Sequence, residues 1–471
     1  MEKINIFINT KESFTPKAKY VFETIFRILG KKTQFFTEFT MQNIHIYYGE
    51  KTSDKYPINI YHNPEAADFF SKRKLYNEDE ANLVKYGDEY IPFLFSKQGK
   101  ITHYTAKSAE LRKDIISSAF YFLSCWQEYA SEKLIEPSNF FQHSASLQYI
   151  HGFTEIPVVD RYCEILQGML VNILSDYVVD NIWENNNNFA LSLSHNIDYW
   201  KYWTDEHIEA LRARKDKFFS KKNLFKIIRL FIQKIGMKWF DTTLILRLVI
   251  RHEKNIKAAS SFFILTHDQF PDKRMNYFSD DASKKQLVQI LKDTSINLQG
   301  TKEAGYQEDH LRSELEKMSD FSAKGFRVRY LNFNYQNLFT VLEKEKIEFD
   351  SSMGFYEAIG FRAGISYPFY PFNIAENRSF NVLEIPVVVT DRSLFKLTNG
   401  DVRKAKRKVF DLLKSAEKHH SHISIIWHNH IFDRIDYPGW GKLYWRINKF
   451  DRNKGRWICS VDDVAKFWMK R

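Results

Sequence analysis

Cysteine is scarce in this sequence, and long apolar runs are missing. The 471 residues include three cysteines, Cys125, Cys163 and Cys459, which lie far apart and form no CxxC pair. This pattern excludes a disulfide framework and a cysteine-built zinc site. No run approaches the roughly 18 apolar residues of a membrane-spanning helix, and the first residues, MEKINIFINT, lack a signal-peptide pattern. We therefore expect reduced thiols and a cytoplasmic protein.

Acidic residues are almost missing from one segment, which holds most of the net charge of +11. Residues 211–240 contain ten lysines and arginines against one acid, Asp216. A patch this local does not predict nucleic-acid binding. Within it, 222–240 is amphipathic, and two interpretations stay open. The segment lies on an anionic membrane surface, making the protein peripheral to the inner membrane, or it covers a barrel with its basic face in solvent.

The first part of the chain, residues 1–184, alternates strand-like and helix-like runs and predicts a small α/β domain. The polar run WENNNN, 183–188, predicts the domain boundary. The expected strands are 4–9, 43–49, 58–63 and 89–95, and the expected helices are 16–30, 113–129 and 159–179. This part contains no catalytic motif.

The second part, residues 189–471, repeats strand–helix units with a basic helical insert at about 202–251, and it predicts a parallel sheet or barrel. The expected strands are 189–195, 260–266, 295–300, 327–333, 349–354, 382–389 and 422–428. Polar residues gather where several of these strands end, and they are His195, Asn196, Asp198, Gln299, Asp350 and His428. In parallel α/β folds the carboxyl ends of the strands carry the functional site.

Six stretches of the second part resemble the polysaccharide deacetylase superfamily, the carbohydrate esterases of NodB type. They are SLSHNID (192–198), NIKAASSFFIL (255–265), INLQGTKEAG (296–305), FDSSMGFYEAIGFRAGISYPFYPF (349–372), VLEIPVVV (382–389) and IIWHNHIFDRIDYPGWG (425–441). More narrowly, the chain resembles a bacterial subgroup with an N-terminal α/β domain of unknown function. The resemblance implies a distorted (β/α)7-type barrel preceded by a small α/β domain.

The resemblance also implies metal-assisted hydrolysis of the C–N bond of an N-acetylated sugar, with zinc as the usual divalent metal. Asp198 matches the metal-binding aspartate. Gln299 matches the first metal-binding histidine, although an amide binds zinc poorly compared with imidazole. Glu303, four positions further on, is either a replacement ligand or a solvated loop carboxylate.

The implied catalytic residues are only partly retained. Asn196 matches the position of the base aspartate, and an amide cannot accept a proton at neutral pH. Arg362, in GFRAG, matches the arginine that orients the base, and His428 matches the histidine that protonates the leaving amine. His195, His310, Glu303 and Asp350 are further candidates to replace the lost groups.

Aromatic residues follow His428 closely and suggest sugar contacts. Tyr437 and Trp440, in YPGWG, together with His430, either bind a glycan or pack beneath a loop. Two hypotheses therefore stay open. The protein is a divergent carbohydrate deacetylase in surface-polysaccharide metabolism, or it is an inactive member of that superfamily that binds or assembles glycans.

Overall fold

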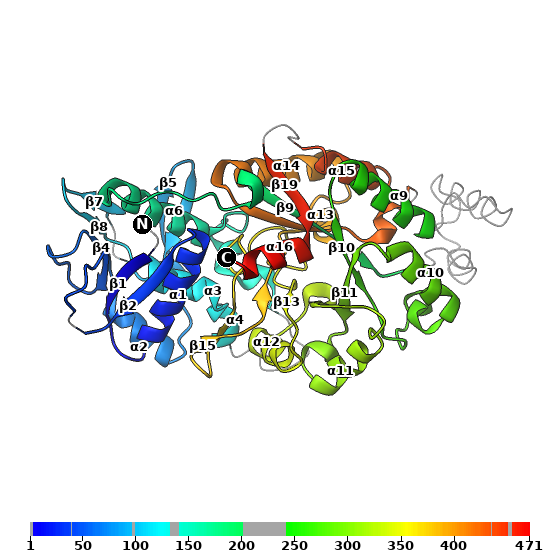
Figure 1. The fold of residues 1–471 in the computed structure, drawn as a ribbon, viewed down its shortest axis with the longest axis horizontal. Helices are drawn as coiled ribbons and strands as arrows, with labels where there is room; N and C mark the ends of the chain where they lie inside the picture. Colours follow the sequence, from blue (N-terminus) through cyan, green and yellow to red (C-terminus); the bar gives the residue numbers. More distant parts are fainter. Residues whose placement is uncertain are drawn as a thin grey trace.

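The computed structural model describes residues 3–38, 40–96, 99–131, 141–200, 242–434, 436–450 and 455–471. Two sheets lie along the long axis of the molecule (Figure 1). One is built from residues 3–111, and the other begins at Phe189. The basic segment 211–240 lies outside the described residues. No helix in the described ranges has the length and hydropathy needed to cross a bilayer.

The first sheet is parallel except at one edge, where β7 runs antiparallel to β8. Its order is β2 (Lys32–Phe36), β1 (Lys3–Asn9), β3 (Ile46–Gly49), β4 (Ile58–Tyr61), β8 (Ala109–Leu111) and β7 (Thr102–Tyr104). A separate hairpin joins β5 (Asn82–Tyr86) and β6 (Glu89–Phe93). The helices of this part are α1 (Thr15–Ile28), α2 (Pro64–Ser71), α3 (Ile115–Leu123), α4 (Trp126–Ala130), α5 (Leu147–Ile150) and α6 (Val158–Ile173).

The helix predicted over 113–129 is wrong as a single element. It divides into α3 and α4 at Cys125, whose φ of 46° places it in the left-handed region. A non-glycine residue there ends the regular hydrogen-bond ladder of α3, so that α4 continues in a new direction. The thiol of Cys125 then contacts the sulfur of Met353 at 3.6 Å, in the second part of the chain.

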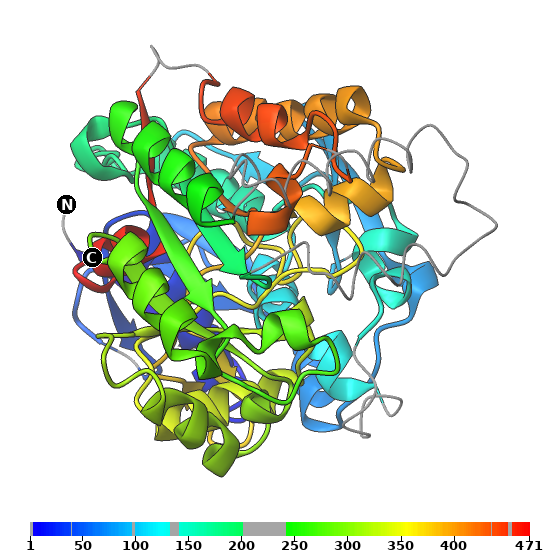
Figure 2. The ribbon, with the colours of Figure 1, turned by 90° about the vertical axis from the view of Figure 1, so that its right-hand side faces the viewer.

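The second sheet curls into a parallel half-barrel (Figure 2). Its order is β16 (Leu383–Glu384), β13 (Phe349–Asp350), β12 (Gly325–Val328), β11 (Ser295–Gly300), β10 (Ser260–Ile264), β9 (Phe189–Ile197), β18 (His422–Ile426) and β17 (Val389–Thr390). The missed strand β19 (Arg456–Ser460) pairs with the first half of β9, where β10 does not reach. A mixed α/β fold with a barrel-like parallel sheet is therefore confirmed.

Helices and a small hairpin complete the second part. The helices are α9 (Thr242–Asn255), α10 (Asp281–Leu291), α11 (Glu308–Glu316), α12 (Tyr335–Lys344), α13 (Asp391–Leu397), α14 (Val402–His419), α15 (Trp440–Ile447) and α16 (Val461–Met469). The hairpin joins β14 (Phe372–Asn373) and β15 (Arg378–Ser379).

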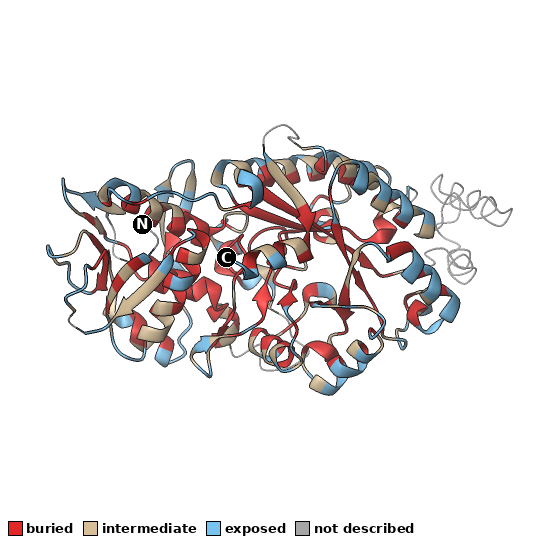
Figure 3. Cartoon of the chain, viewed as in Figure 1, coloured by how far each residue is buried: buried red, intermediate tan, exposed pale blue. Residues whose placement is uncertain are grey.

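Strand β9 lies at the centre of the half-barrel, and all nine of its residues are buried (Figure 3). Helices cover a parallel sheet on the outside, so its central strands are apolar nearly throughout. The two hydroxyls in β9 are accommodated by hydrogen bonds: Ser192 contacts Nε2 of His422 at 2.8 Å, and Ser194 donates to the carbonyl of Ile425 at 3.0 Å. The strand is thereby fixed against β18, and its polar carboxyl end is held at the rim of the sheet.

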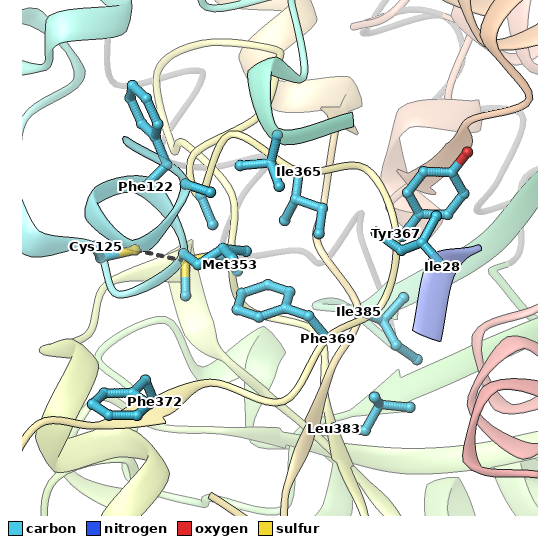
Figure 4. Close-up of a cluster of buried hydrophobic side chains, with 14 of the residues drawn as sticks. Ile28, Phe122, Cys125, Met353, Ile365, Tyr367, Phe369, Phe372, Leu383 and Ile385 are labelled. Atoms are coloured by element: carbon cyan, nitrogen blue, oxygen red, sulfur yellow. Dashed lines mark hydrogen bonds between the residues drawn. The ribbon is translucent and has the colours of Figure 1, made fainter. Parts of the chain in front are cut away.

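The two parts of the chain share one continuous hydrophobic core (Figure 4). Ile28 and Phe122 come from the first part, and they belong to the same buried cluster as Met353, Ile365 and Phe372 from the second. A shared core of this kind opposes independent movement of two parts, unlike the polar interfaces between loosely joined domains. The first part is therefore fixed relative to the half-barrel.

The turn GFRAG, 360–364, is a second link across this junction. A Cβ atom at Gly360 would come within 2.2 Å of the carbonyl oxygen of Thr154, so only glycine allows this approach. The amide of Phe361 donates to that same carbonyl at 2.9 Å, and the amide of Val159 donates to the carbonyl of Gly364 at 2.8 Å. The turn thus binds the first part of the chain through its backbone.

Candidate functional site

Polar side chains from the ends of three strands meet at the rim of the half-barrel. Asn196 lies in β9 and Asp198 just beyond it, Gln299 lies in β11, and His428 follows β18 by two residues. They line a small pocket that is partly open to solvent, together with Tyr330, Leu331, Tyr356, Thr390, Arg392 and Ile426. The pocket occupies the place where a parallel sheet usually carries its site.

Asn196 is held by a buried arginine that the sequence analysis missed. Nη1 of Arg327, in β12, donates to Oδ1 of Asn196 at 2.9 Å, and its guanidinium lies 3.8 Å above the ring of Phe263. Burial lowers the pKa of Arg327 to about 9, although the Asp350 and Glu384 carboxyls oppose the shift. Since Oδ1 is occupied by Arg327, the NH₂ group of Asn196 is the end directed at the pocket.

His428 is oriented by a buried carboxylate, Asp391, at the start of α13. Nδ1 of His428 lies 2.6 Å from Oδ1 of Asp391, and the backbone amide of His428 donates to Oδ2 at 2.6 Å. Burial alone would raise the pKa of Asp391, but the contacts with His428 lower it below its usual range. The ionised carboxylate accepts the Nδ1 proton, so Nε2 of His428 carries the lone pair that faces Asn196 at 3.4 Å.

Asp198 lies close to the side chains of Arg392 and His428. Nη2 of Arg392 lies 3.6 Å from its Oδ2, and Nε2 of His428 lies 3.7 Å from the same atom. Burial would raise the pKa of Asp198, but His428, His430 and Arg392 together lower it. Asp198 is thus an ionised carboxylate beside a permanent cation.

Gln299 completes this side of the pocket. Its Nε2 donates to Oδ1 of Asp198 at 3.3 Å. Its buried Oε1 has no hydrogen-bond partner among the described residues. A buried acceptor without a partner is costly, which favours a ligand or water that donates to it.

The side chains around this pocket do not provide a set of ligands that suits zinc. A zinc site takes three or four histidine, cysteine or carboxylate ligands. Asp198 and His428 are two such groups, and the next neighbours are the Gln299 amide and the Arg392 guanidinium. No cluster of three metal-ligating side chains occurs within the described ranges of the chain. Arg392 places a positive charge beside the carboxylate that a divalent cation would need, and the two like charges would repel.

Two predicted site residues lie away from this pocket. Arg362 does not contact Asn196; its Nε and Nη2 donate to the Glu128 carboxylate at 2.7 and 2.6 Å, across the junction between the two parts. Arg327 contacts residue 196 instead. Glu303 begins the short turn after β11 and is not among the residues that line the pocket.

The other side chains that could replace the missing catalytic groups do not face the pocket. His195 alternates with Asn196 along β9, so its ring faces the helix layer, where Nε2 lies 3.1 Å from Oε1 of Glu253. Asp350 is buried beside Ser352, whose hydroxyl donates to it at 2.8 Å. His310 lies exposed on α11.

The predicted aromatic contacts separate into buried and partly exposed groups. Trp440 is fully buried between Phe395 and Trp427, at centroid distances of 5.1 and 6.1 Å, and it has no free face for a sugar. Tyr437 is half-buried, with its ring 5.7 Å from that of His430. Burial, followed by the nearby His428, lowers the pKa of His430 to about 4. His430 is therefore a neutral ring behind His428.

Arg327, Asp391 and Arg392 are the site residues that sequence reasoning missed. Arg327 was placed within a predicted strand, but alternation along a strand does not say which face is the inner one. Asp391 and Arg392 follow the predicted strand 382–389 directly, and a polar DR pair at a strand end was the available signal.

Comparison with known proteins gives limited guidance. A model described as a family of unknown function (DUF7033) matches residues 6–175. No curated protein matches the sequence.

Several solved structures share a distant similarity with the chain. A protein described as a polysaccharide deacetylase from Mycobacterium smegmatis is 12% identical, with a TM-score of 0.39, over 61% of this chain and 92% of that one. One from Pseudomonas aeruginosa PAO1 is 13% identical, with a TM-score of 0.41, over 63% and 96%. Puue allantoinase is 14% identical, with a TM-score of 0.38, over 63% and 98%. The geometry of the site therefore carries the functional argument.

Proposed function

We propose that this chain is a remote, distorted (β/α)7-barrel relative of the polysaccharide deacetylases that binds N-acylated glycans and lacks zinc-dependent deacetylation. The motifs at 192–198 and 425–441 support the relationship. The observation that carries the loss of hydrolysis is the contact of Arg327 with Asn196, which holds an amide where the base would stand. Arg392 beside Asp198 opposes metal binding, because its positive charge repels a divalent cation.

The remaining groups suit an N-acyl sugar. The NH₂ group of Asn196 donates to an acyl oxygen, while Asp198 and the unpartnered Oε1 of Gln299 accept from an amide N–H or a hydroxyl. The half-exposed ring of Tyr356 and the exposed ring of Tyr330 border the same pocket and offer faces to a sugar.

A comparison of two disaccharides tests this proposal. N,N′-diacetylchitobiose and cellobiose differ by their acetamido and hydroxyl groups. We expect the first to bind about 5- to 150-fold more tightly by calorimetry, because two net hydrogen bonds contribute about 0.5–1.5 kcal/mol each. An Asp198→Ala variant loses this preference, whereas Asp309→Ala, on the exposed face of α11, keeps it. Equal affinities, or no binding of either sugar, would contradict the proposal.

A second candidate function is metal-independent deacetylation, and the Asp391–His428 pair favours it. In that reaction Nε2 of His428 takes a proton from water, and the resulting hydroxide attacks the amide carbon. The C–N bond then breaks, and the proton passes to the leaving amine. Acetate release that persists with a chelator and disappears in His428→Ala would establish this function. Binding without acetate release supports the first proposal.

A further inference from the structure

Arg392 lies at the mouth of the site pocket, beside two tyrosine rings that also contact each other. Its guanidinium carbon lies 5.2 Å from the ring centroid of Tyr330 and 5.9 Å from that of Tyr356. Nη1 also donates to the hydroxyl of Tyr356 at 3.3 Å. Arginine stacks favourably on aromatic faces, so the two rings fix the plane of the guanidinium.

The donor groups of Arg392 are used less fully than those of three other arginines in the described part of the chain. Arg161, Arg362 and Arg378 each bind a carboxylate through two nitrogens at 3.1 Å or less. The contact of Arg392 with Asp198 is longer, at 3.6 Å, and 31% of its side chain is exposed. A fixed, partly exposed guanidinium therefore retains donors for a planar anion.

The backbone beside Arg392 is strained in a way that presents Tyr330 to the pocket. Tyr330 and Leu331 have φ values of 62° and 53°, so two successive non-glycine residues adopt the left-handed region. Each such residue costs on the order of 1–3 kcal/mol, and strain of this kind concentrates at ligand-binding sites. Leu331 is anchored in a buried cluster with Val387 and Ile426, while Tyr330 is left 43% exposed.

A second positive charge lies behind Tyr330. Nη2 of Arg329 donates to the hydroxyl of Tyr330 at 2.7 Å, and its guanidinium carbon lies 4.3 Å from the ring centroid of Phe270. Arg392 thus lines the pocket and Arg329 contacts the Tyr330 side chain, whereas Asp198 is the carboxylate among the lining residues. The mouth is complementary to an anion attached to a ring that stacks on tyrosine.

We propose that Arg392, with the rings of Tyr330 and Tyr356, binds a carboxylate on the glycan, so that the ligand is an acidic N-acylated sugar. This inference rests on the proposed glycan-binding function and names the class of sugar. Arg392, Tyr330 and Tyr356 select which sugar binds. The acyl group contacts Asn196 and Asp198, and the acidic group contacts Arg392.

Two sugars with the same ring test this inference. N-acetylglucosaminuronic acid carries a carboxylate where N-acetylglucosamine carries a hydroxymethyl group. The full-length protein should bind the acid at least about tenfold more tightly by calorimetry, as a charge-assisted pair predicts. In Arg392→Gln the ratio should fall to near one, because the acid loses affinity while the neutral sugar binds as before. Arg392→Lys, which keeps the charge without the planar fork, should give an intermediate ratio.

The controls separate the two proposals. Arg403→Gln removes an exposed arginine at the start of α14 and should leave the wild-type ratio unchanged. If both sugars bind the wild type equally, or if Arg392→Gln keeps the preference, the acidic-sugar inference fails and glycan binding stands. If neither sugar binds, the proposed function fails, and the inference fails with it.

Discussion

A single amide at position 196 determines what the pocket does. A carboxylate there would pair with Arg327 and accept a proton from water, whereas Asn196 gives its oxygen to Arg327 and its NH₂ group to the pocket. The same exchange leaves Arg327 buried without a charged partner on this side, and burial lowers its pKa to about 9. Position 196 therefore presents a hydrogen-bond donor to the pocket.

Replacing Asn196 by aspartate should stabilise the protein in a pH-dependent way. The new carboxylate would pair with Arg327, which depresses the folded pKa of the carboxylate by about 1–3 and adds about 1.4–4 kcal/mol at pH 7. A depressed pKa gives stability that is complete above the unfolded pKa of about 4 and is lost as the pH falls through the folded pKa. Urea unfolding of Asn196→Asp and wild type from pH 7 to pH 3 measures this difference.

A matched control for that measurement is Asn43→Asp, at an exposed position of the first part of the chain. It should change the free energy of unfolding by less than about 0.5 kcal/mol at either pH. If Asn196→Asp is no more stable than wild type at pH 7, or is more stable by the same amount at every pH, the new carboxylate does not pair with Arg327.

At the scale of elements, strand β18 carries both the site and a buried histidine. His422 begins the strand, with Nε2 2.8 Å from the Ser192 hydroxyl and Nδ1 3.2 Å from the carbonyl of Ser366. Burial lowers the pKa of His422 to about 4, while the backbone contact with Ser366 opposes the shift. The imidazole therefore stays neutral in the folded protein and holds β18 beside β9.

The folded protein should lose stability as His422 is titrated. His422 binds a proton at about pH 6.5 in the unfolded chain and at about pH 4 in the folded chain. Its neutral form therefore contributes fully to stability above pH 6.5, and this contribution is lost as the pH falls towards 4. The full loss from this group is about 3–4 kcal/mol, because each difference of one in pKa corresponds to about 1.4 kcal/mol. Thermal unfolding of His422→Gln should show a shallower decline over this range than wild type.

The exposed His310 provides the comparison for that experiment. His310→Gln, on α11, should follow the wild-type pH curve. A His422→Gln curve parallel to that of wild type between pH 6.5 and 4 would contradict a neutral buried imidazole at this position.

The elements of the fold were largely predictable, and their exact roles were not. Periodicity predicted β9, β11 and β18, because buried parallel strands form apolar runs of distinct length. It missed β19, whose five residues, RWICS, lack such a run. It also missed the break at Cys125, because the contact with Met353 that accompanies it joins residues 228 positions apart. The contact between Arg327 and Asn196 likewise joins distant parts of the chain, so the sequence pattern did not predict that Arg327, rather than Arg362, binds Asn196.

At the scale of the whole molecule, the first part of the chain is joined to the half-barrel by a buried ion pair. Arg362 and Glu128 are both almost fully buried, and the guanidinium also donates to the carbonyl of Gly354 at 3.1 Å. Burial would lower the pKa of Arg362, but Glu128 raises it. The arginine of the GFRAG turn therefore stabilises the junction between the two parts.

Removing one partner of this pair should destabilise the whole protein. Arg362→Met leaves the Glu128 carboxylate buried without its cation, which costs about 3–5 kcal/mol. Chemical denaturation followed by fluorescence should show one cooperative transition at a lower midpoint. The double variant Arg362→Met with Glu128→Gln should recover part of the loss, because no charge is left unpaired.

An exposed pair provides the reference. Arg378→Met removes the partner of Glu343 on the surface, and it should cost about 1 kcal/mol or less. If Arg362→Met costs no more than Arg378→Met, or if it abolishes glycan binding without changing stability, Arg362 does not act at the junction.

The central claim, that this pocket binds N-acylated glycans without zinc, is tested most directly by one titration. N,N′-diacetylchitobiose is titrated calorimetrically into the full-length protein, once after exhaustive chelation and once with equimolar zinc. We expect the same dissociation constant in both samples, because Asn196, Asp198 and Gln299 would contact the acyl group directly, and the positive charge of Arg392 beside Asp198 opposes zinc binding. Binding that appears only with zinc, or that is absent in both samples, would contradict the account.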